Sequence, residues 1–156
     1  MDSDGLFLNT LALTTTICGF FSEIFQVVGP SSAVLVHVGE DVTLPASLSP
    51  VISAQKFEVI WFRDDFDSPV FLYQNLQIRP EYQMQAYEGR TALFTEELLK
   101  GNVSLRLQDV RVSDGGLYKC FVDSGLWNEE VHITLNVEGD FLLFSCYSMS
   151  PLVVVT

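Results

Sequence analysis

The segment from Ser113 to Cys120 constrains the fold of this chain more than any other, because it carries the pattern Asp-x-Gly-x-Tyr-x-Cys. Aspartate and glycine favour a turn, and the alternating residues that follow favour a β-strand. Successive side chains of a strand point to opposite faces, which places Tyr118, Cys120 and Val122 inward. Four residue types at fixed offsets each meet a separate physical requirement, so chance agreement is improbable. The rest of the chain is therefore expected to supply further short strands that pack against this one.

Short apolar runs between turn residues recur along the chain and predict an all-β domain of packed antiparallel sheets. Residues 103–108 and 131–137 alternate between apolar and polar side chains without interruption, as half-buried antiparallel strands do. In the run at residues 57–63, Trp61 shares one face with Phe57 and Val59, which makes it the predicted core tryptophan. The other strands are predicted at residues 33–38, 42–48, 70–74, 83–87 and 91–94.

These segments resemble the variable-type immunoglobulin domain of butyrophilins and of the related myelin-oligodendrocyte glycoprotein. The resemblance covers residues 25–138, and its motifs, in a consistent order, include Val38 to Pro45, Trp61 to Arg63, Gly89 to Thr91 and Val110 to Cys120. It implies an immunoglobulin variable-type (V-set) antiparallel β-sandwich, with an extra strand pair between the third and fourth strands of the smaller constant type.

The same resemblance implies a recognition module at the cell surface. The expected activity is to bind a protein counter-receptor on another cell, such as a T cell, and to regulate T-cell receptor signalling and cytokine production. The alternatives are homophilic adhesion through a homodimer, or a secreted decoy domain. The expected location is the extracellular face of the plasma membrane, with secretion as the alternative.

One position departs from the family pattern, because Ala46 stands where the resembling proteins have the cysteine of their second strand. Cys120 is therefore expected to lack a disulfide partner, since Cys18 lies in an N-terminal apolar run and Cys146 lies in the C-terminal tail. A disulfide over such a loop stabilises a domain by roughly 2 to 5 kcal/mol, so its loss weakens the fold. Cys120 is either a buried thiol that packs like a small apolar side chain or a reactive thiol, and its inward position favours the first.

The resemblance also implies an ion pair between Arg90 and Asp114 that closes one end of the sandwich. Arginine suits this position because its planar guanidinium can meet a carboxylate with two hydrogen bonds. The Tyr118 hydroxyl is expected to bond to nearby backbone. Together with Trp61 and Cys120, these residues form the predicted structural set, and none of them is expected to be catalytic.

Composition argues against nucleic-acid binding and against enzymatic chemistry. The 20 acidic and 8 basic side chains give a net charge of −12, which repels a phosphate backbone. His37 and His132 are isolated from each other and from any cysteine or carboxylate pair at metal-ligand spacing. The chain has no glycine-rich phosphate loop and no nucleophile elbow, so no cofactor, metal or catalytic residue is expected.

Apolar residues on the predicted outward face suggest a binding surface. If Trp61 points inward, Ile60 and Phe62 point outward, and Phe121 joins them from the neighbouring strand. Trp127 lies in the loop that follows, and tryptophan is the residue type most often found to anchor interfaces. We therefore predict that Phe62, Phe121 and Trp127 contact the partner; the alternative for Trp127 is that it folds back over the two phenylalanines.

Asn102-Val103-Ser104 is the only N-glycosylation sequon of the chain. Asn102 follows a glycine in a predicted turn and shares the predicted outward orientation of Ser104 and Arg106. A glycan on Asn102 is therefore expected if the protein is secreted.

Two apolar segments flank the predicted domain. Residues 1–22 are predicted to be a signal peptide, because an uncharged apolar run extends from Leu6 to Ser22. Residues 139–156 form an apolar tail that is shorter than the roughly 20 residues needed to span a bilayer. This tail is expected to be either a truncated membrane anchor or the end of a secreted product.

Overall fold

The computed structural model describes residues 24–139, and β-strands make up most of its regular structure. The strands are β1 (Gln26–Val28), β2 (Val34–His37), β3 (Val42–Leu44), β4 (Ser47–Ser49), β5 (Glu58–Phe62), β6 (Phe71–Gln74), β7 (Gln77–Ile78), β8 (Thr91–Leu93), β9 (Leu105–Leu107), β10 (Gly116–Asp123) and β11 (Asn128–Glu138). The connections contain the short 3-10 helices η1 (Pro80–Tyr82), η2 (Gln85–Tyr87), η3 (Glu97–Lys100) and η4 (Val112–Asp114). The predicted all-β class is confirmed. Among these residues no helix is long and apolar enough to cross a membrane.

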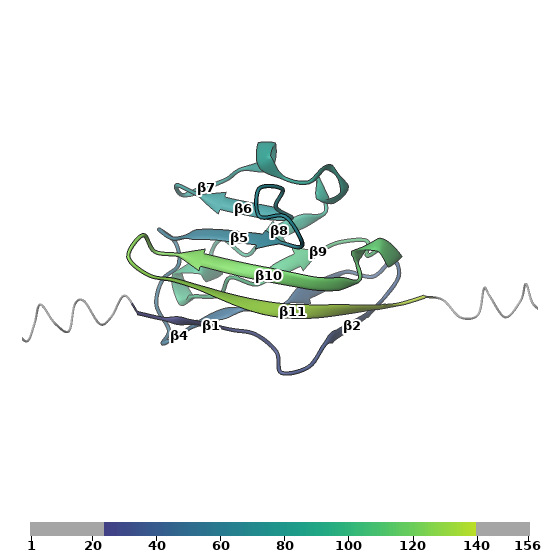
Figure 1. The fold of residues 1–156 in the computed structure, drawn as a ribbon, viewed down its shortest axis with the longest axis horizontal. Coiled ribbons are helices and arrows are strands. Elements are labelled where there is room, and N and C mark those ends of the chain that lie inside the picture. Colours follow the sequence, from purple (N-terminus) through teal and green to yellow (C-terminus); the bar gives the residue numbers. More distant parts are fainter. Residues whose placement is uncertain (1–23, 140–156) are drawn as a thin grey trace, which may run out of the picture.

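The strands form two layers (Figure 1). One layer is a six-stranded sheet with the order β2-β11-β10-β5-β6-β7. The other layer consists of the three-stranded sheet β3-β9-β8 and the strand pair β1-β4. All pairings are antiparallel except that of β11 with β2. The long hairpin of β10 and β11 crosses the middle of the first layer and carries the motif that begins at Asp114.

The N-terminal part of the chain passes from one layer to the other. β1 pairs with β4 in the second layer, whereas β2 pairs with β11 in the first. Gly29 and Pro30 lie at the crossing, where a side chain at Gly29 would approach Val131 Cγ2 to 3.1 Å. The proline ends the ladder because it has no N–H to donate. This short connection closes the edge of the sandwich against β11.

The predicted strand at residues 42–48 is divided in two by Pro45 and Ala46. Pro45 cannot donate a ladder hydrogen bond, so regular pairing of β3 with β9 stops before it. Ala46 N donates instead to the hydroxyl of Ser104 (3.0 Å), and Ala46 O accepts from Val103 N (2.9 Å). Ser104 is consequently buried although it lines the outer groove that also contains Asn102, so its predicted outward orientation is confirmed while its side chain is covered.

The predicted strand at residues 83–87 is also wrong, because this segment contains η2 and no strand. The Gln83 side-chain amide donates to the carbonyls of Val70 (2.6 Å) and Tyr87 (3.1 Å) and so holds the segment as a bridge between the layers. The second member of the extra strand pair is β7, which follows β6 after a tight turn at Asn75 and Leu76. Both turn residues have positive φ, as a two-residue hairpin turn requires.

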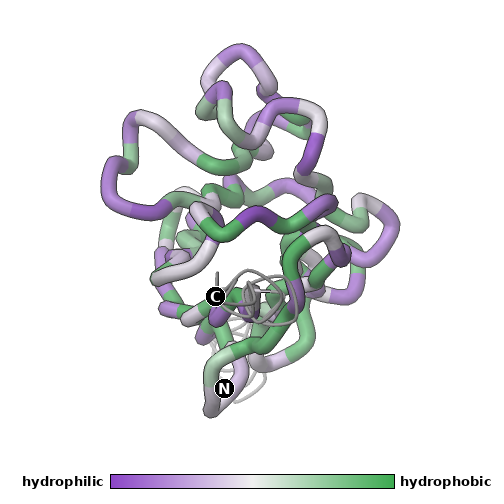
Figure 2. The backbone as a smooth tube through the Cα atoms, turned by 90° about the vertical axis from the view of Figure 1, so that its right-hand side faces the viewer, coloured by the Kyte–Doolittle hydropathy of each residue, from purple (hydrophilic) through white to green (hydrophobic). Residues whose placement is uncertain are grey.

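The core lies between the layers and is built on Trp61, Tyr118 and Cys120, each 0% exposed. Side chains alternate along β10 as predicted, with Tyr118, Cys120 and Val122 buried and the residues between them half-buried. Figure 2 shows the hydrophilic residues gathered mostly in the peripheral loops. The predicted signal peptide and most of the apolar tail lie outside the described residues.

Candidate functional site

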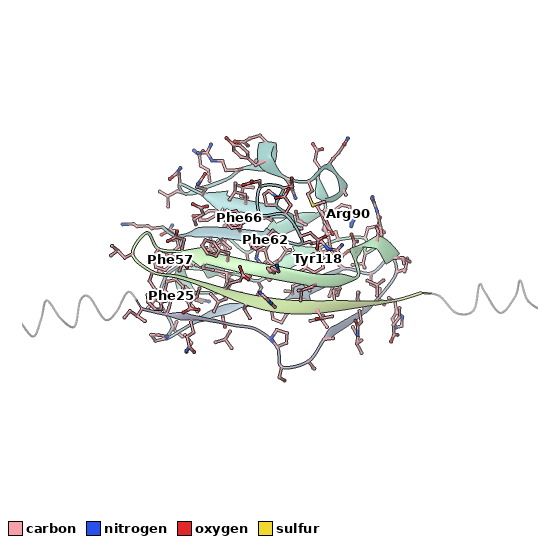
Figure 3. All side chains as sticks on the ribbon, in the orientation of Figure 1. Phe25, Phe57, Phe62, Phe66, Arg90 and Tyr118 are labelled. Atoms are coloured by element: carbon pink, nitrogen blue, oxygen red, sulfur yellow. The ribbon has the colours of Figure 1, made fainter. Side chains whose placement is uncertain are left out.

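A buried ion pair closes one end of the sandwich. Arg90 Nη1 donates to Asp114 Oδ2 at 3.1 Å, and Nη2 makes a second contact with the same carboxylate. Asp114 Oδ2 also accepts from the backbone N–H of Arg111 (2.8 Å). Arg90 precedes β8 in one layer, and Asp114 precedes β10 in the other. The pair therefore ties the two layers together at the end where Figure 3 labels Arg90 and Tyr118.

Next to this pair, a chain of hydrogen bonds fixes the start of β10. Arg63 Nη1 donates to the Tyr87 hydroxyl (3.0 Å), which lies 3.0 Å from the hydroxyl of Tyr118. Tyr118 donates in turn to the carbonyl of Asp114 (2.6 Å). Burial and the bond to Tyr87 raise the pKa of Tyr118 well above its usual value. The neutral hydroxyl is thus the form that the fold requires.

Arg63 also explains the glycine of the motif. Its guanidinium donates to the carbonyls of Ser113 (2.8 Å) and Gly115 (2.5 Å) and lies 5.0 Å from the ring centroid of Tyr118. A Cβ at Gly116 would lie 2.6 Å from Arg63 Nη2, and Gly116 has a φ of +129°. Only glycine fits this position without strain. The role of Arg63, which directly follows the last residue of β5, was not predicted from the sequence.

Ala46 and Cys120 are both buried in the core, at 2% and 0% exposure. Cys120 is a free thiol. Burial, together with the nearby Glu130 carboxylate, raises its pKa well above the usual value, which suppresses the nucleophilic thiolate. Trp61 Nε1 donates to Val103 O (3.0 Å), so the indole makes a hydrogen-bonded tie across the core. The structure thus places Cys120 in an apolar setting.

The outer face of the six-stranded sheet, which points away from the second layer, differs from the prediction. Ile60 and Phe62 are 3% and 6% exposed, so the expectation that they are exposed is wrong. Phe66, from the loop after β5, folds back over the sheet with its ring 5.2 Å from Phe62 and 5.5 Å from Phe121. Phe66 itself is 44% exposed. These three rings form the aromatic cluster, and Figure 3 shows Phe66 beside Phe62.

Charged side chains lie beside the aromatic cluster and are called the charged rim. Lys119 Nζ lies 5.4 Å from the ring centroid of Phe62. On the side toward β6, a hollow of about 160 Å³ adjoins Phe66. Its apolar lining consists of Ile60, Phe66, Pro69, Leu72 and Tyr82, and its acidic lining consists of Glu58 and Asp67. Aromatic and aliphatic walls beside carboxylates fit a basic side chain that also carries an apolar stem.

Trp127 lies at the end of the sheet, away from the aromatic cluster. Its indole Nε1 donates to Phe25 O (2.9 Å), and its own backbone N–H donates to Ser124 Oγ (3.0 Å). The indole is therefore tied to the N-terminal part of the fold and is not placed over Phe62 or Phe121 as the alternative expected. The side chain keeps 38% exposure.

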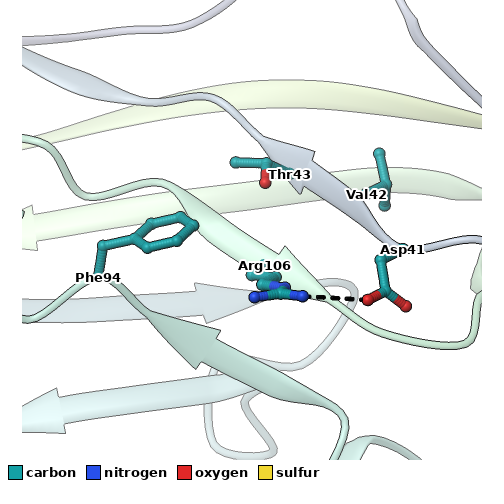
Figure 4. A pocket seen from close by; sticks show the side chains of 5 residues that line it. All are labelled: Asp41, Val42, Thr43, Phe94 and Arg106. Carbon is teal, nitrogen blue, oxygen red and sulfur yellow. Dashed lines mark hydrogen bonds and ion pairs between the residues drawn. The ribbon is translucent and has the colours of Figure 1, made fainter.

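The outer surface of the second layer carries two further hollows. The one in Figure 4, about 310 Å³, is lined by Asp41, Val42, Thr43, Phe94 and Arg106. Arg106 pairs with Asp41 at 3.2 Å, and the pKa of Asp41 is lowered by hydrogen bonds from the Asp109 backbone and from Arg106. Its charges are thus paired with each other. The second hollow contains Asn102. Within residues 24–139, no group of three or more His, Cys, Asp or Glu side chains could hold a metal ion.

Comparison with protein families matches residues 29–138 to the immunoglobulin V-set domain. Butyrophilin subfamily 2 member A2 of Homo sapiens is 37% identical over 124 residues, which are 80% of this chain and 24% of that protein. Myelin-oligodendrocyte glycoprotein of Macaca fascicularis is 36% identical over 145 residues, which are 93% of this chain and 57% of that protein. The chain thus spans less than two thirds of the length of these relatives.

Solved structures show the same fold. Bovine butyrophilin is 38% identical with a TM-score of 0.71, and the match covers 74% of this chain and 55% of that one. The human B7-H4 IgV-like domain is 25% identical with a TM-score of 0.65, and the match covers 74% of this chain and 97% of that one.

Proposed function

Because the chain belongs to the immunoglobulin V-set family, with relatives among butyrophilins and myelin-oligodendrocyte glycoproteins, we propose that it is a cell-surface recognition domain. Its partner is a protein counter-receptor on another cell, and its binding site is the outer face of the six-stranded sheet. On this proposal a T cell carries the counter-receptor, and binding regulates T-cell receptor signalling and cytokine production.

The observation that supports this proposal is the exposed ring of Phe66. Phe66 is 44% exposed, and it is an apolar residue in a loop whose other side chains, among them the carboxylates of Asp64, Asp65 and Asp67, are mostly polar. Contacts with Phe62 and Phe121 hold the ring in place, so its conformational entropy is already reduced before a partner binds. Pre-ordered aromatic rings at the centre of a polar rim are typical of interface anchors.

The charge around Phe66 indicates the chemistry of the partner. Glu58 and Asp67 line the hollow beside the ring, and the whole chain has a net charge of −12. A partner with lysine or arginine side chains at its surface gains from this field, both in its rate of association and in its specificity. Binding is therefore expected to weaken as the salt concentration rises.

Cell binding by single-residue variants of the full chain tests this assignment. Phe66→Ala is expected to lower the affinity for T cells at least roughly 10-fold, as loss of an anchor does. Phe94→Ala is the matched control, because Phe94 has a similar exposure of 38% but lies on the opposite layer. Equal effects of the two substitutions would contradict the assignment of the outer face. The test also includes Phe121→Ala and Trp127→Ala, the two predicted contact residues that retain exposed surface.

The homophilic alternative meets an electrostatic obstacle. In a symmetric dimer the same patch of both copies is in contact, so the carboxylates of Glu58 and Asp67 from both copies would enter one interface, with Lys119 as the basic group described beside them. Like charges across an interface cost free energy unless a cation or a basic side chain lies between them. Sedimentation of the full chain separates the two functions: a dimer that dissociates on Phe66→Ala substitution would favour adhesion over counter-receptor binding.

A further inference from the structure

The sequon at Asn102 occupies a defined place in the second layer. It follows Gly101, whose φ of +75° ends η3, and Asn102 forms an isolated bridge with Ser47. Val103 and Ser104 are buried, whereas Asn102 is half-buried. The Asn102 side chain lines the outer surface of this layer, on the opposite side of the sandwich from the aromatic cluster.

The hydrogen bonds of Asn102 fix the orientation of its amide. Ser104 N donates to the amide oxygen Oδ1 at 3.1 Å, and Ser104 Oγ donates to the same atom at 2.6 Å. A backbone N–H can only donate, so the atom that it meets must be the oxygen. The amide nitrogen Nδ2 consequently points the other way, and it has no hydrogen-bond partner among the described residues.

Asn102 stands in a groove of about 530 Å³. Its apolar lining includes Val28, Pro30 and Pro45, and its charged lining consists of Glu97 and Lys100. A sugar ring has one apolar face of C–H groups and a rim of hydroxyl groups, so both kinds of lining suit it. Lys100 and Glu97 make a surface ion pair at 3.3 Å, with side chains 73% and 40% exposed, and such a pair is easily replaced by hydrogen bonds to a ligand.

We propose that Asn102 carries an N-linked glycan whose first sugar residues lie in this groove. A bond forms between Nδ2 and the anomeric carbon of an oligosaccharide, and the bond from that carbon to its lipid diphosphate donor breaks. The diphosphate leaves with the electron pair, and Nδ2 loses one proton. The glycan covers the second layer and leaves the outer face of the six-stranded sheet free. This proposal rests on the proposed cell-surface function, because the donor is met only in the secretory pathway.

Expression of the full chain in cultured mammalian cells tests the modification. Treatment with a peptide-N-glycosidase should lower the mass of the wild-type protein and convert Asn102 to aspartate. Asn102→Gln should abolish the change, whereas Asn136→Gln, an exposed asparagine outside any sequon, should leave it unaltered. Protein that reaches the cell surface or the medium without a glycan would overturn the glycan and leave the recognition function standing. Retention in the cytosol would overturn both.

Chemical acetylation tests whether the glycan lies in the groove. Lys100 should react several-fold more slowly in the glycosylated wild-type protein than in the Asn102→Gln variant, while exposed Lys56 should react equally in both. Equal rates at Lys100 would show that the glycan projects into solvent, and would overturn its placement in the groove.

Discussion

Restoring the cysteine of the second strand should create a disulfide in this domain. Ala46 is 2% exposed and Cys120 is 0% exposed, and both belong to the same core cluster between the layers. In the Ala46→Cys variant the new bond would close a loop of roughly 75 residues, which restricts the unfolded chain by an amount equivalent to about 4 kcal/mol. Strain in the native bond would reduce this gain, because Val103 ties the backbone at residue 46.

Urea denaturation with and without a reductant measures the effect. At about 1.5 kcal/mol per molar urea, the oxidised variant should unfold at a midpoint roughly 2 to 3 M higher than its reduced form. Cys18 and Cys146 are replaced by serine throughout, so that only the designed pair can form. The control adds Cys120→Ser, which should remove the difference. If the Ala46→Cys variant keeps two free thiols and an unchanged midpoint without reductant, residue 46 does not face Cys120, and the inference that it occupies the place of the family's cysteine is wrong.

Three further predictions concern the other buried groups. Arg90→Met should lower the unfolding free energy by about 3 to 5 kcal/mol, because it leaves the buried carboxylate of Asp114 without its partner. Arg106→Met removes an exposed ion pair and should lower the unfolding free energy by less than about 1 kcal/mol. Similar values for the two variants in urea titrations would refute the role of Arg90 in joining the layers. Gly116→Ala should lower stability by about 1 to 3 kcal/mol through its positive φ, and a neutral effect would contradict this strained backbone conformation at position 116. The pKa values of Cys120 and Tyr118 are both raised in the fold, so the contribution of these two groups to stability should be level below about pH 8.5 and fall as pH rises past their unfolded values of about 8.5 and 10. Cys120→Ala should flatten the first part of that fall, and an unaltered slope between about pH 8.5 and 10 would exclude the thiol as its source.

Regular alternation in the sequence predicts most of this fold because it reports burial directly. The motif that ends at Cys120 predicts which side chains of β10 point inward and which point outward. The uninterrupted alternation of apolar and polar residues predicts the long strand β11. The predicted strands are wrong where side-chain hydrogen bonds, or a residue without a backbone N–H, take the place of hydrogen bonds between strands. Gln83 bonds to two backbone carbonyls and so replaces a strand by a bridge, and Pro45 divides a strand that its neighbours favour. Neither effect has a periodic signature.

The candidate surface was predictable as a region but not in its detail. Alternation correctly places Phe62 and Phe121 on the outer side of the sheet, yet it says nothing about a loop that folds over them. One signal in the sequence could have identified the ring that packs over Phe62 and Phe121: Phe66 is the apolar residue among the carboxylates from Asp64 to Asp67. Its position over the rings depends on tertiary contacts, which a single sequence does not contain.

Loss of the disulfide should not affect the recognition surface, because the bonds that join the two layers differ from the bonds that hold the strands of the recognition surface. Trp61 Nε1 reaches Val103 O across the core, and the Arg90–Asp114 pair joins the layers at one end, so two ties remain without a bond at Cys120. β10 pairs along its length with β11 and over its second half with β5, which means that the strands beneath Phe66 are held within their own sheet. A tie between the layers changes the free energy of unfolding without moving these strands. The oxidised Ala46→Cys variant should therefore be more stable than the wild-type protein and should bind T cells with unchanged affinity.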